Sequence, residues 1–120
     1  MMASRAAAFF KEQNYGNIIN IGSTAAVKGY PTGTIYSSSK WALRGMTECW
    51  RTELRKHNVR VFLVNPSEVT TAFGNPDRVE REEIPNKLRA QEIAHTVKSL
   101  LEMDDRGFVP ELSVWATNPF

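Results

Sequence analysis

The sequence predicts an α/β fold built on a parallel β-sheet. Two short apolar runs rich in β-branched residues, at 18–21 and 59–64, have the composition of strands buried on both faces. A long stretch with helical spacing separates them, and a third apolar run at 108–115 follows another helical stretch. Strands that alternate with helices pair in parallel through crossover connections. We therefore expect about three parallel strands, near residues 17–22, 59–65 and 108–115, with flanking helices.

The composition is that of an ordinary single domain. The chain has 120 residues and a formal net charge of +2, with Lys and Arg dispersed among acidic residues, which argues against a nucleic-acid partner. No apolar run approaches the roughly 18 residues of a membrane span, so no membrane partner is expected, and we assign no metal site. The single cysteine, Cys49, excludes an internal disulfide and is compatible with a cytoplasmic location. We expect it to be a packing residue.

The N-terminal part of the chain predicts one helix and one strand. Small residues recur on one face of residues 1–13, and Asn14, Tyr15 and Gly16 form a typical helix stop signal. The strand that follows ends at a glycine, which places Ser23 at its carboxyl end. Ligands of open parallel sheets bind at this end of the strands.

The next helix carries Tyr36 and Lys40. A loop with glycine and proline at 29–33 leads into it, and its apolar positions keep to one stripe. The members of that stripe are Leu43, Met46, Thr47, Trp50 and Leu54. The four-residue spacing puts Tyr36 and Lys40 on one face, a single turn apart.

Ser23, Tyr36 and Lys40 together suit proton transfer to or from an oxygen atom. A phenol is a weak acid at neutral pH, but a nearby ammonium favours the phenolate and makes Tyr36 a usable proton donor. The Ser23 hydroxyl could hold a carbonyl or alcohol oxygen beside it. The three residues fit carbonyl reduction or alcohol oxidation. A Tyr-x-x-x-Lys pair alone is more often the ordinary start of an amphipathic helix.

The second strand brings a further polar segment to the same edge of the sheet. Residues 65–71 follow it and lie, by the parallel arrangement, beside Ser23. His57 precedes the strand in the last helical turn, next to two cationic residues, where it satisfies the helix dipole rather than acting as a base.

The C-terminal third predicts a polar insert, a helix and an edge strand. Residues 73–89 are charged and contain prolines, as a lid or substrate-binding loop with little core would. Helical spacing resumes over 90–103. Pro110 interrupts the last apolar run, which makes an edge position the expected one for this strand.

Taken in order, these motifs resemble the short-chain dehydrogenase/reductase family. They are Asn20-Ile21-Gly22-Ser23, Tyr36-Ser37-Ser38-Ser39-Lys40 with Trp41-Ala42-Leu43-Arg44-Gly45, and Val59-Arg60-Val61 leading to Asn65-Pro66. Within the family, the motifs resemble most closely those of 3-oxoacyl-carrier-protein reductase-like members. The resemblance implies the C-terminal half of a Rossmann-like, doubly wound parallel sheet. Residues 1–120 would then form one partial domain that lacks the N-terminal, glycine-rich dinucleotide-binding half.

The resemblance also implies a role for individual residues. The catalytic set is Ser23, Tyr36 and Lys40, and the residues at the cofactor, NAD or NADP, are Tyr36, Lys40, Pro66, Val69 and Thr71. Thr71 would touch the nicotinamide carboxamide, and Thr70 takes that role if the register slips by one. Ser67 departs from the family, which usually has glycine there, and so leaves the backbone less free to approach the nicotinamide.

Three functions remain open at this point. The first is hydride transfer between a nicotinamide cofactor and a small carbonyl or alcohol substrate, in a homo-oligomer that packs through the Tyr36-containing helix. The second is a catalytically inactive fragment or subunit-interaction module, and we expect the chain on its own to be inactive. The third is a family relative that catalyses epimerisation or dehydration, since Tyr-x-x-x-Lys serves there too.

Overall fold

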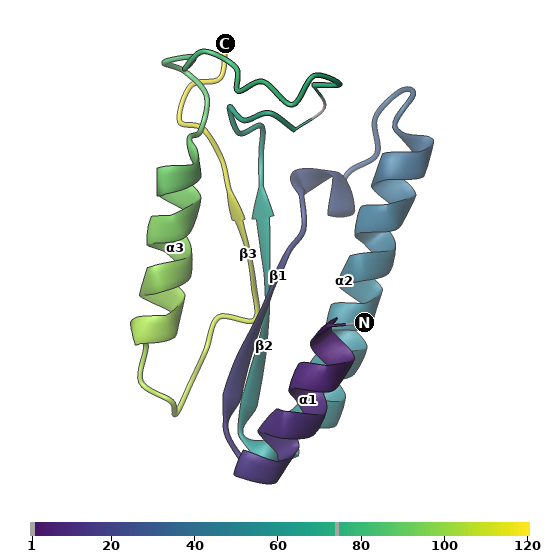
Figure 1. The fold of residues 1–120 in the computed structure, drawn as a ribbon, viewed down its shortest axis with the longest axis vertical. Helices are drawn as coiled ribbons and strands as arrows, with labels where there is room; N and C mark the ends of the chain where they lie inside the picture. Colours follow the sequence, from purple (N-terminus) through teal and green to yellow (C-terminus); the bar gives the residue numbers. More distant parts are fainter. Residues whose placement is uncertain (1, 74) are drawn as a thin grey trace.

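The computed structural model describes residues 2–73 and 75–120, so the predicted helix start at Met1 lies outside it. It is an α/β fold in three layers, as predicted. The elements in chain order are α1 (Met2–Gln13), β1 (Gly16–Ile21), the 3₁₀ turn η1 (Thr24–Ala26), α2 (Thr34–Leu54), the 3₁₀ turn η2 (Arg55–His57), β2 (Val59–Pro66), α3 (Ala90–Glu102) and β3 (Glu111–Val114). The helices α1 and α2 cover one face of the sheet and α3 covers the other (Figure 1).

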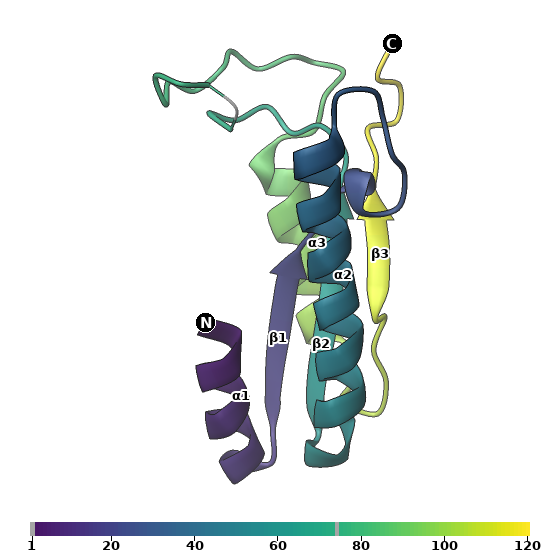
Figure 2. The ribbon, with the colours of Figure 1, turned by 90° about the vertical axis from the view of Figure 1, so that its right-hand side faces the viewer.

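The sheet has the order β1-β2-β3 with both pairs parallel, as the strand and helix alternation predicted. β1 pairs with β2 from Gly16↔Val59 to Ile21↔Val64, and β2 pairs with β3 from Leu63↔Glu111 to Pro66↔Val114. Within the described residues each outer strand has one neighbour, so β1 and β3 are edges (Figure 2). β3 begins only after Pro110, because proline has no N–H for the ladder.

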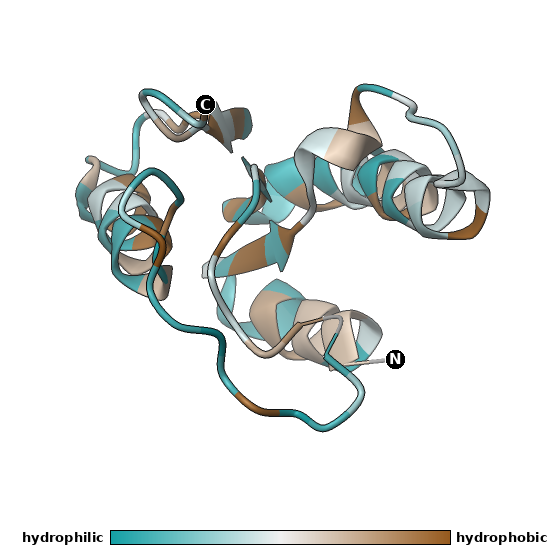
Figure 3. Ribbon diagram, turned by 90° about the horizontal axis from the view of Figure 1, so that it is seen from above, coloured by the Kyte–Doolittle hydropathy of each residue, from teal (hydrophilic) through white to brown (hydrophobic). Residues whose placement is uncertain are grey.

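The central strand β2 is buried on both faces and carries two separate cores. On one face Ile18, Leu54, Val59 and Val61 cluster with partly buried side chains of α1 and α2. On the other face Phe62, Val64 and Leu100 form the second cluster, which packs β2 against α3. Seen from above, the sheet runs between α3 and the α1 and α2 pair (Figure 3). Apolar burial on both sides of one strand is what holds the three layers together.

The end of the sheet near residue 107 is tied by a buried arginine. Arg60 in β2 is 6% exposed, and its guanidinium donates to Asn17 Oδ1 at 2.8 Å and to the carbonyl oxygen of Met103 at 3.1 Å. It also donates to the carbonyl oxygen of Gly107 at 3.3 Å and pairs with Asp105 at 3.3 Å. The turn between α3 and β3 is thereby anchored to the sheet.

One packing prediction is wrong. Cys49 is exposed rather than packed inside the protein. The reason is its place on the helix: Thr47 is fully buried against the sheet, and Cys49, two residues later, lies about 200° further round α2 and so on the side away from the sheet. Met46, also expected on the buried stripe, is 39% exposed.

Candidate active site

Ser23 lies just beyond the carboxyl end of β1 and caps the short turn η1. Its Oγ accepts a hydrogen bond from the backbone N–H of Ala25 at 3.1 Å, and its own N–H donates to Asn65 Oδ1 at 3.2 Å. The side chain is half-buried. Both bonds fix the backbone around Ser23, and the hydroxyl hydrogen remains available to a ligand.

Tyr36 and Lys40 lie in the first two turns of α2. Lys40 Nζ donates to the carbonyl oxygen of Ile21 at 3.2 Å and lies 5.7 Å from the centre of the Tyr36 ring. The Tyr36 ring packs against Phe73, with ring centres 5.8 Å apart. The Lys40 ammonium thus contacts the end of β1 and lies near the Tyr36 ring, and the two side chains share one face of α2, as the four-residue spacing predicts.

The loop after β2 is held in place by the segment that precedes α3. Thr70 N–H donates to the carbonyl oxygen of Leu88 at 2.8 Å, and Val69 forms a parallel bridge with the same residue. Arg81 donates to the carbonyl oxygens of Thr71 at 3.1 Å and Val69 at 3.0 Å. These bonds order the loop that carries two of the predicted cofactor-binding residues, Val69 and Thr71.

An ionised carboxylate joins the same two segments at the rim of the site. Glu68 pairs with Lys87 at 3.0 Å and with Arg81 at 3.3 Å. The hydrogen bond from Lys87, with a further one from Arg81, lowers the pKa of the Glu68 carboxyl below its usual range. Glu68 is therefore charged at neutral pH and keeps the loop closed against residues 81–87.

A cleft of about 890 Å³ opens at this edge of the sheet. Every residue predicted for the site lines it: Ser23, Tyr36, Lys40, Pro66, Val69 and Thr71. Thr70, the alternative to Thr71, is not among its lining residues, and its hydroxyl is buried. Residues distant in the sequence are thus gathered around one space large enough for a small ligand.

A second hollow, of about 1030 Å³, lies between the start of α3 and the C-terminal segment. It contains none of the predicted site residues. We place the candidate site in the smaller cleft, because that is where the groups capable of proton transfer meet.

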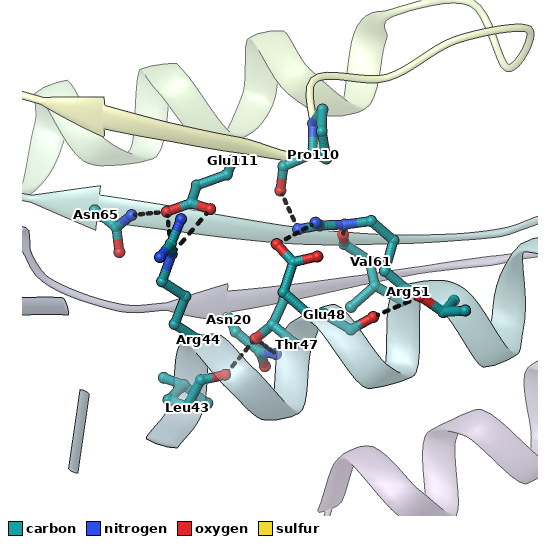
Figure 4. A network of polar contacts seen from close by, with 11 residues as sticks. Asn20, Leu43, Arg44, Thr47, Glu48, Arg51, Val61, Asn65, Pro110 and Glu111 are labelled. Atoms are coloured by element: carbon teal, nitrogen blue, oxygen red, sulfur yellow. Dashed lines mark hydrogen bonds and ion pairs between the residues drawn. The ribbon is translucent and has the colours of Figure 1, made fainter. Parts of the chain in front are cut away.

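The structure also shows a polar stripe on α2 that sequence reasoning missed. Its members are Lys40, Arg44, Thr47 and Arg51, and each bonds to a strand or to the residue next to one. Figure 4 shows Arg44, Thr47 and Arg51 facing the sheet side by side. The three-to-four-residue spacing of these polar residues was the available signal, but it was hidden among apolar residues with the same period.

Across residues 2–73 and 75–120, none of the helices combines the length and apolarity that crossing a membrane requires. In that same part of the chain, no three or more His, Cys, Asp or Glu side chains gather where they could hold a metal ion.

Comparison with known proteins identifies the family. Residues 1–82 match the short chain dehydrogenase family. The L-xylulose reductase of Caenorhabditis elegans is 36% identical over 97 residues, which are 81% of this chain and 37% of that protein. The 3-oxoacyl-[acyl-carrier-protein] reductase of Thermotoga maritima is 35% identical over 78 residues, 65% of this chain and 29% of that protein.

Among solved structures, an alcohol dehydrogenase from the archaeon Thermococcus sibiricus complexed with 5-hydroxy-NADP superposes with a TM-score of 0.77. It is 28% identical, and the match covers 90% of this chain and 44% of that one. The chain belongs to the short-chain dehydrogenase/reductase family, and its fold is a Rossmann-like α/β fragment. It spans less than half the length of each of these three relatives.

Proposed function

We propose that this chain carries the catalytic Ser23, Tyr36 and Lys40 of a nicotinamide-dependent oxidoreductase. The reaction is hydride transfer between NAD or NADP and the carbonyl or hydroxyl carbon of a small substrate. The observation that carries the proposal is the common cleft. Ser23 comes from β1, Tyr36 and Lys40 come from α2, and Pro66, Val69 and Thr71 come from the end of β2 and the loop after it, yet all six line one space.

The chemistry assigned to these side chains is general acid and base catalysis. Tyr36 donates its phenolic proton to the substrate oxygen during reduction and accepts it during oxidation. Lys40 lies with its ammonium 5.7 Å from the Tyr36 ring centre, where it can hold the cofactor beside the proton donor. Ser23 donates a hydrogen bond to the same substrate oxygen as negative charge develops on it.

The residues that line the cleft support the cofactor assignment. Apolar side chains of Ile21 and Val69 line it together with the Thr71 hydroxyl, a combination suited to a flat amide-bearing ring. Ser67, in the family's glycine position, donates its N–H to the Val114 carbonyl oxygen at 2.8 Å. Its hydroxyl accepts from Ala116 N–H at 3.4 Å, so this side chain is engaged with the segment after β3.

A bound nicotinamide supplies or accepts the hydride. In this assignment Lys40, Pro66, Val69 and Thr71 hold the nicotinamide half of the cofactor. Tyr36 and Ser23 face the substrate, within reach of the same region. The residues assigned here would contact the nicotinamide half alone, so the proposal covers NAD and NADP alike.

We also propose that the intact protein assembles as a homo-oligomer through α2. Large apolar side chains remain exposed on this helix, with Ile35 at 87%, Trp41 at 48% and Met46 at 39%. Exposed aromatic and methionine side chains are frequent in protein interfaces. These exposed side chains also support the second candidate function, a subunit-interaction module without turnover.

One experiment separates the enzyme from the interaction module. The full-length protein is purified and supplied with NADH or NADPH and a panel of small ketones, aldehydes and β-ketoacyl thioesters. Loss of reduced-cofactor absorbance that depends on the carbonyl compound is the expected result. Oligomer formation without any hydride transfer, in either direction and with either cofactor, would instead support the module.

A further inference from the structure

Glu111, the first residue of β3, joins two elements that the catalytic residues depend on. Its Oε1 accepts from Asn65 Nδ2 at 3.1 Å and from Arg44 Nε at 3.0 Å, and its Oε2 lies 3.2 Å from the same Arg44 nitrogen (Figure 4). Asn65 belongs to β2 and Arg44 to α2. One carboxylate therefore links the central strand to the helix.

The Asn65 side of this link leads to Ser23. Asn65 is fully buried, and its Oδ1 accepts the Ser23 N–H at 3.2 Å. The side-chain amide of Asn65 accepts through its oxygen and donates through its NH₂. If this amide were flipped, its oxygen would face the Glu111 carboxylate and its NH₂ would face the Ser23 N–H, and both hydrogen bonds would be lost. The carboxylate thus fixes the orientation in which Asn65 can hold Ser23. The backbone at Gly22 packs directly on this amide, because a Cβ there would collide with Asn65 Oδ1.

The Arg44 side of the link leads to Tyr36. Residues 36, 40 and 44 succeed one another at four-residue steps on one face of α2. Lys40 is bonded to the end of β1 and Arg44 to the start of β3. The cleft half of α2 is thus tied down at Lys40 and Arg44, and also at Ser37, whose hydroxyl donates to the Ala25 carbonyl oxygen at 3.0 Å. Among these three contacts, the one to Glu111 uses two charged groups.

We propose that Glu111 is a positioning residue that sets Ser23 and Tyr36 in a fixed relation, through Asn65 on one side and Arg44 on the other. The side chains of Glu111 and Arg44 are 21% and 38% exposed, so the pair is shielded more than an ordinary surface ion pair. The consequence for turnover rests on the proposed function, but the effect on the Ser23 backbone does not.

The direct test is hydrogen exchange at the Ser23 amide, measured by NMR in the full-length protein. Glu111→Ala removes the partner that orients Asn65, so the Ser23 amide is expected to exchange about fivefold to tenfold faster, the equivalent of one weakened hydrogen bond. Asn65→Ala is expected to have at least as large an effect. Glu111→Gln keeps an accepting oxygen and is expected to fall between Glu111→Ala and the parent.

Arg51→Met is the matched control. Arg51 also ties α2 to the sheet, with bonds to the carbonyl oxygens of Val61 at 3.1 Å and Pro110 at 2.8 Å, but it contacts neither Ser23 nor Asn65. This variant is expected to lower the Tm by an amount similar to Glu111→Ala while leaving Ser23 exchange within twofold of the parent. The inference is overturned if Glu111→Ala leaves Ser23 exchange unchanged, or if Arg51→Met accelerates it equally.

Turnover gives the second readout. Glu111→Ala is expected to lower kcat about tenfold with a smaller change in KM, because misplaced reacting groups lose rate more than affinity. Arg51→Met is expected to keep the parental kcat. A parent without hydride transfer but with Ser23 exchange that responds to Glu111→Ala would refute the proposed function and uphold the positioning. Parental kcat in Glu111→Ala would overturn the positioning.

Discussion

Lys40 Nζ donates a 3.2 Å hydrogen bond to the carbonyl oxygen of Ile21, the last residue of β1. This bond joins α2 to the end of the strand that precedes Ser23. It therefore links the element that carries Tyr36, the proposed proton donor, to the element that carries Ser23, the proposed oxygen-binding hydroxyl. An ammonium held there ties the strand end to α2 and lies 5.7 Å from the centre of the Tyr36 ring. The predictions for Tyr36 and Lys40 follow from this arrangement.

Tyr36→Phe is expected to lower turnover of the full-length enzyme by about 10² to 10⁴, the usual contribution of general acid catalysis. The phenyl ring keeps its packing against Phe73, so cofactor affinity is expected to stay near the parental value. Steady-state rates and fluorescence titration with NADH or NADPH measure the two quantities. Tyr15→Phe, which removes a hydroxyl outside the cleft, is the control. Parental activity in Tyr36→Phe would show that the catalytic assignment is wrong.

Lys40→Met is expected to reduce both turnover and cofactor affinity. The variant loses the ammonium that donates to the Ile21 carbonyl oxygen at 3.2 Å and lies 5.7 Å from the Tyr36 ring centre, so the strand end and the proposed proton donor lose a shared neighbour. Steady-state rates and fluorescence titration with NADH or NADPH measure the two quantities. Lys98→Met, at an exposed lysine paired only with Glu102 among the ion pairs of the described residues, serves as the control. Parental turnover and affinity in Lys40→Met would contradict the proposed role of Lys40.

The 120-residue chain on its own is expected to bind nicotinamide cofactors weakly and to self-associate. No glycine-rich phosphate-binding turn follows a strand in the sequence, and the outer edge of β1 has no partner strand in the described residues. Ile21 at the end of that edge is 45% exposed. Calorimetric titration combined with sedimentation measures both properties. Micromolar affinity for NADH or NADPH in a monomeric sample would refute the expectation.

Glu92→Gln is expected to destabilise the protein at neutral pH and to have little effect near pH 2. Hydrogen bonds from the Arg89 side chain and then from its backbone N–H lower the pKa of Glu92 from 4.5 to about 2. A carboxyl with a lowered folded-state pKa stabilises the fold above its unfolded pKa, and this contribution disappears as the pH falls through the folded value. The stability difference should therefore close between pH 4.5 and about 2.

Thermal melts of the parent and Glu92→Gln across that pH range measure the effect. The change in Tm should be modest, since the capping box at the start of α3 is at the surface. Glu82→Gln, at an exposed carboxylate before α3, is the control and should track the parent. A Tm difference that persists unchanged at pH 2 would show that Glu92 acts by packing rather than by charge.

The sequence was sufficient for the strands and for the gathering of the cleft residues. Both follow from local patterns: β-branched runs define the strands, and the carboxyl ends of parallel strands meet at one edge. This is why Ser23 and Thr71, 48 positions apart by number, could be placed at the same cleft before the fold was known. The roles of the individual residues remain predictions.

The polar contacts between α2 and the sheet could not be predicted in the same way. Arg44 and Glu111 are separated by 67 positions, and their pairing depends on how the helix lies across the sheet. Asn65 sits in a strand that was recognised by its apolar residues, and no local pattern reveals that its amide bonds to Ser23. The same lack of packing information made the burial of Cys49 a wrong expectation.

The buried Arg60 has a mechanical consequence for the cleft. It fastens the turn between α3 and β3 to Asn17 in β1, at the end of the sheet opposite to Ser23. Because these hydrogen bonds tie that end of the sheet together, we expect α3 and β3 to move with the central strand. The cleft would then open by rotation about the end of the sheet at Arg60. Motion of the protein during substrate entry is therefore expected to be largest in residues 67–73 and 75–89 and smallest near Gly107.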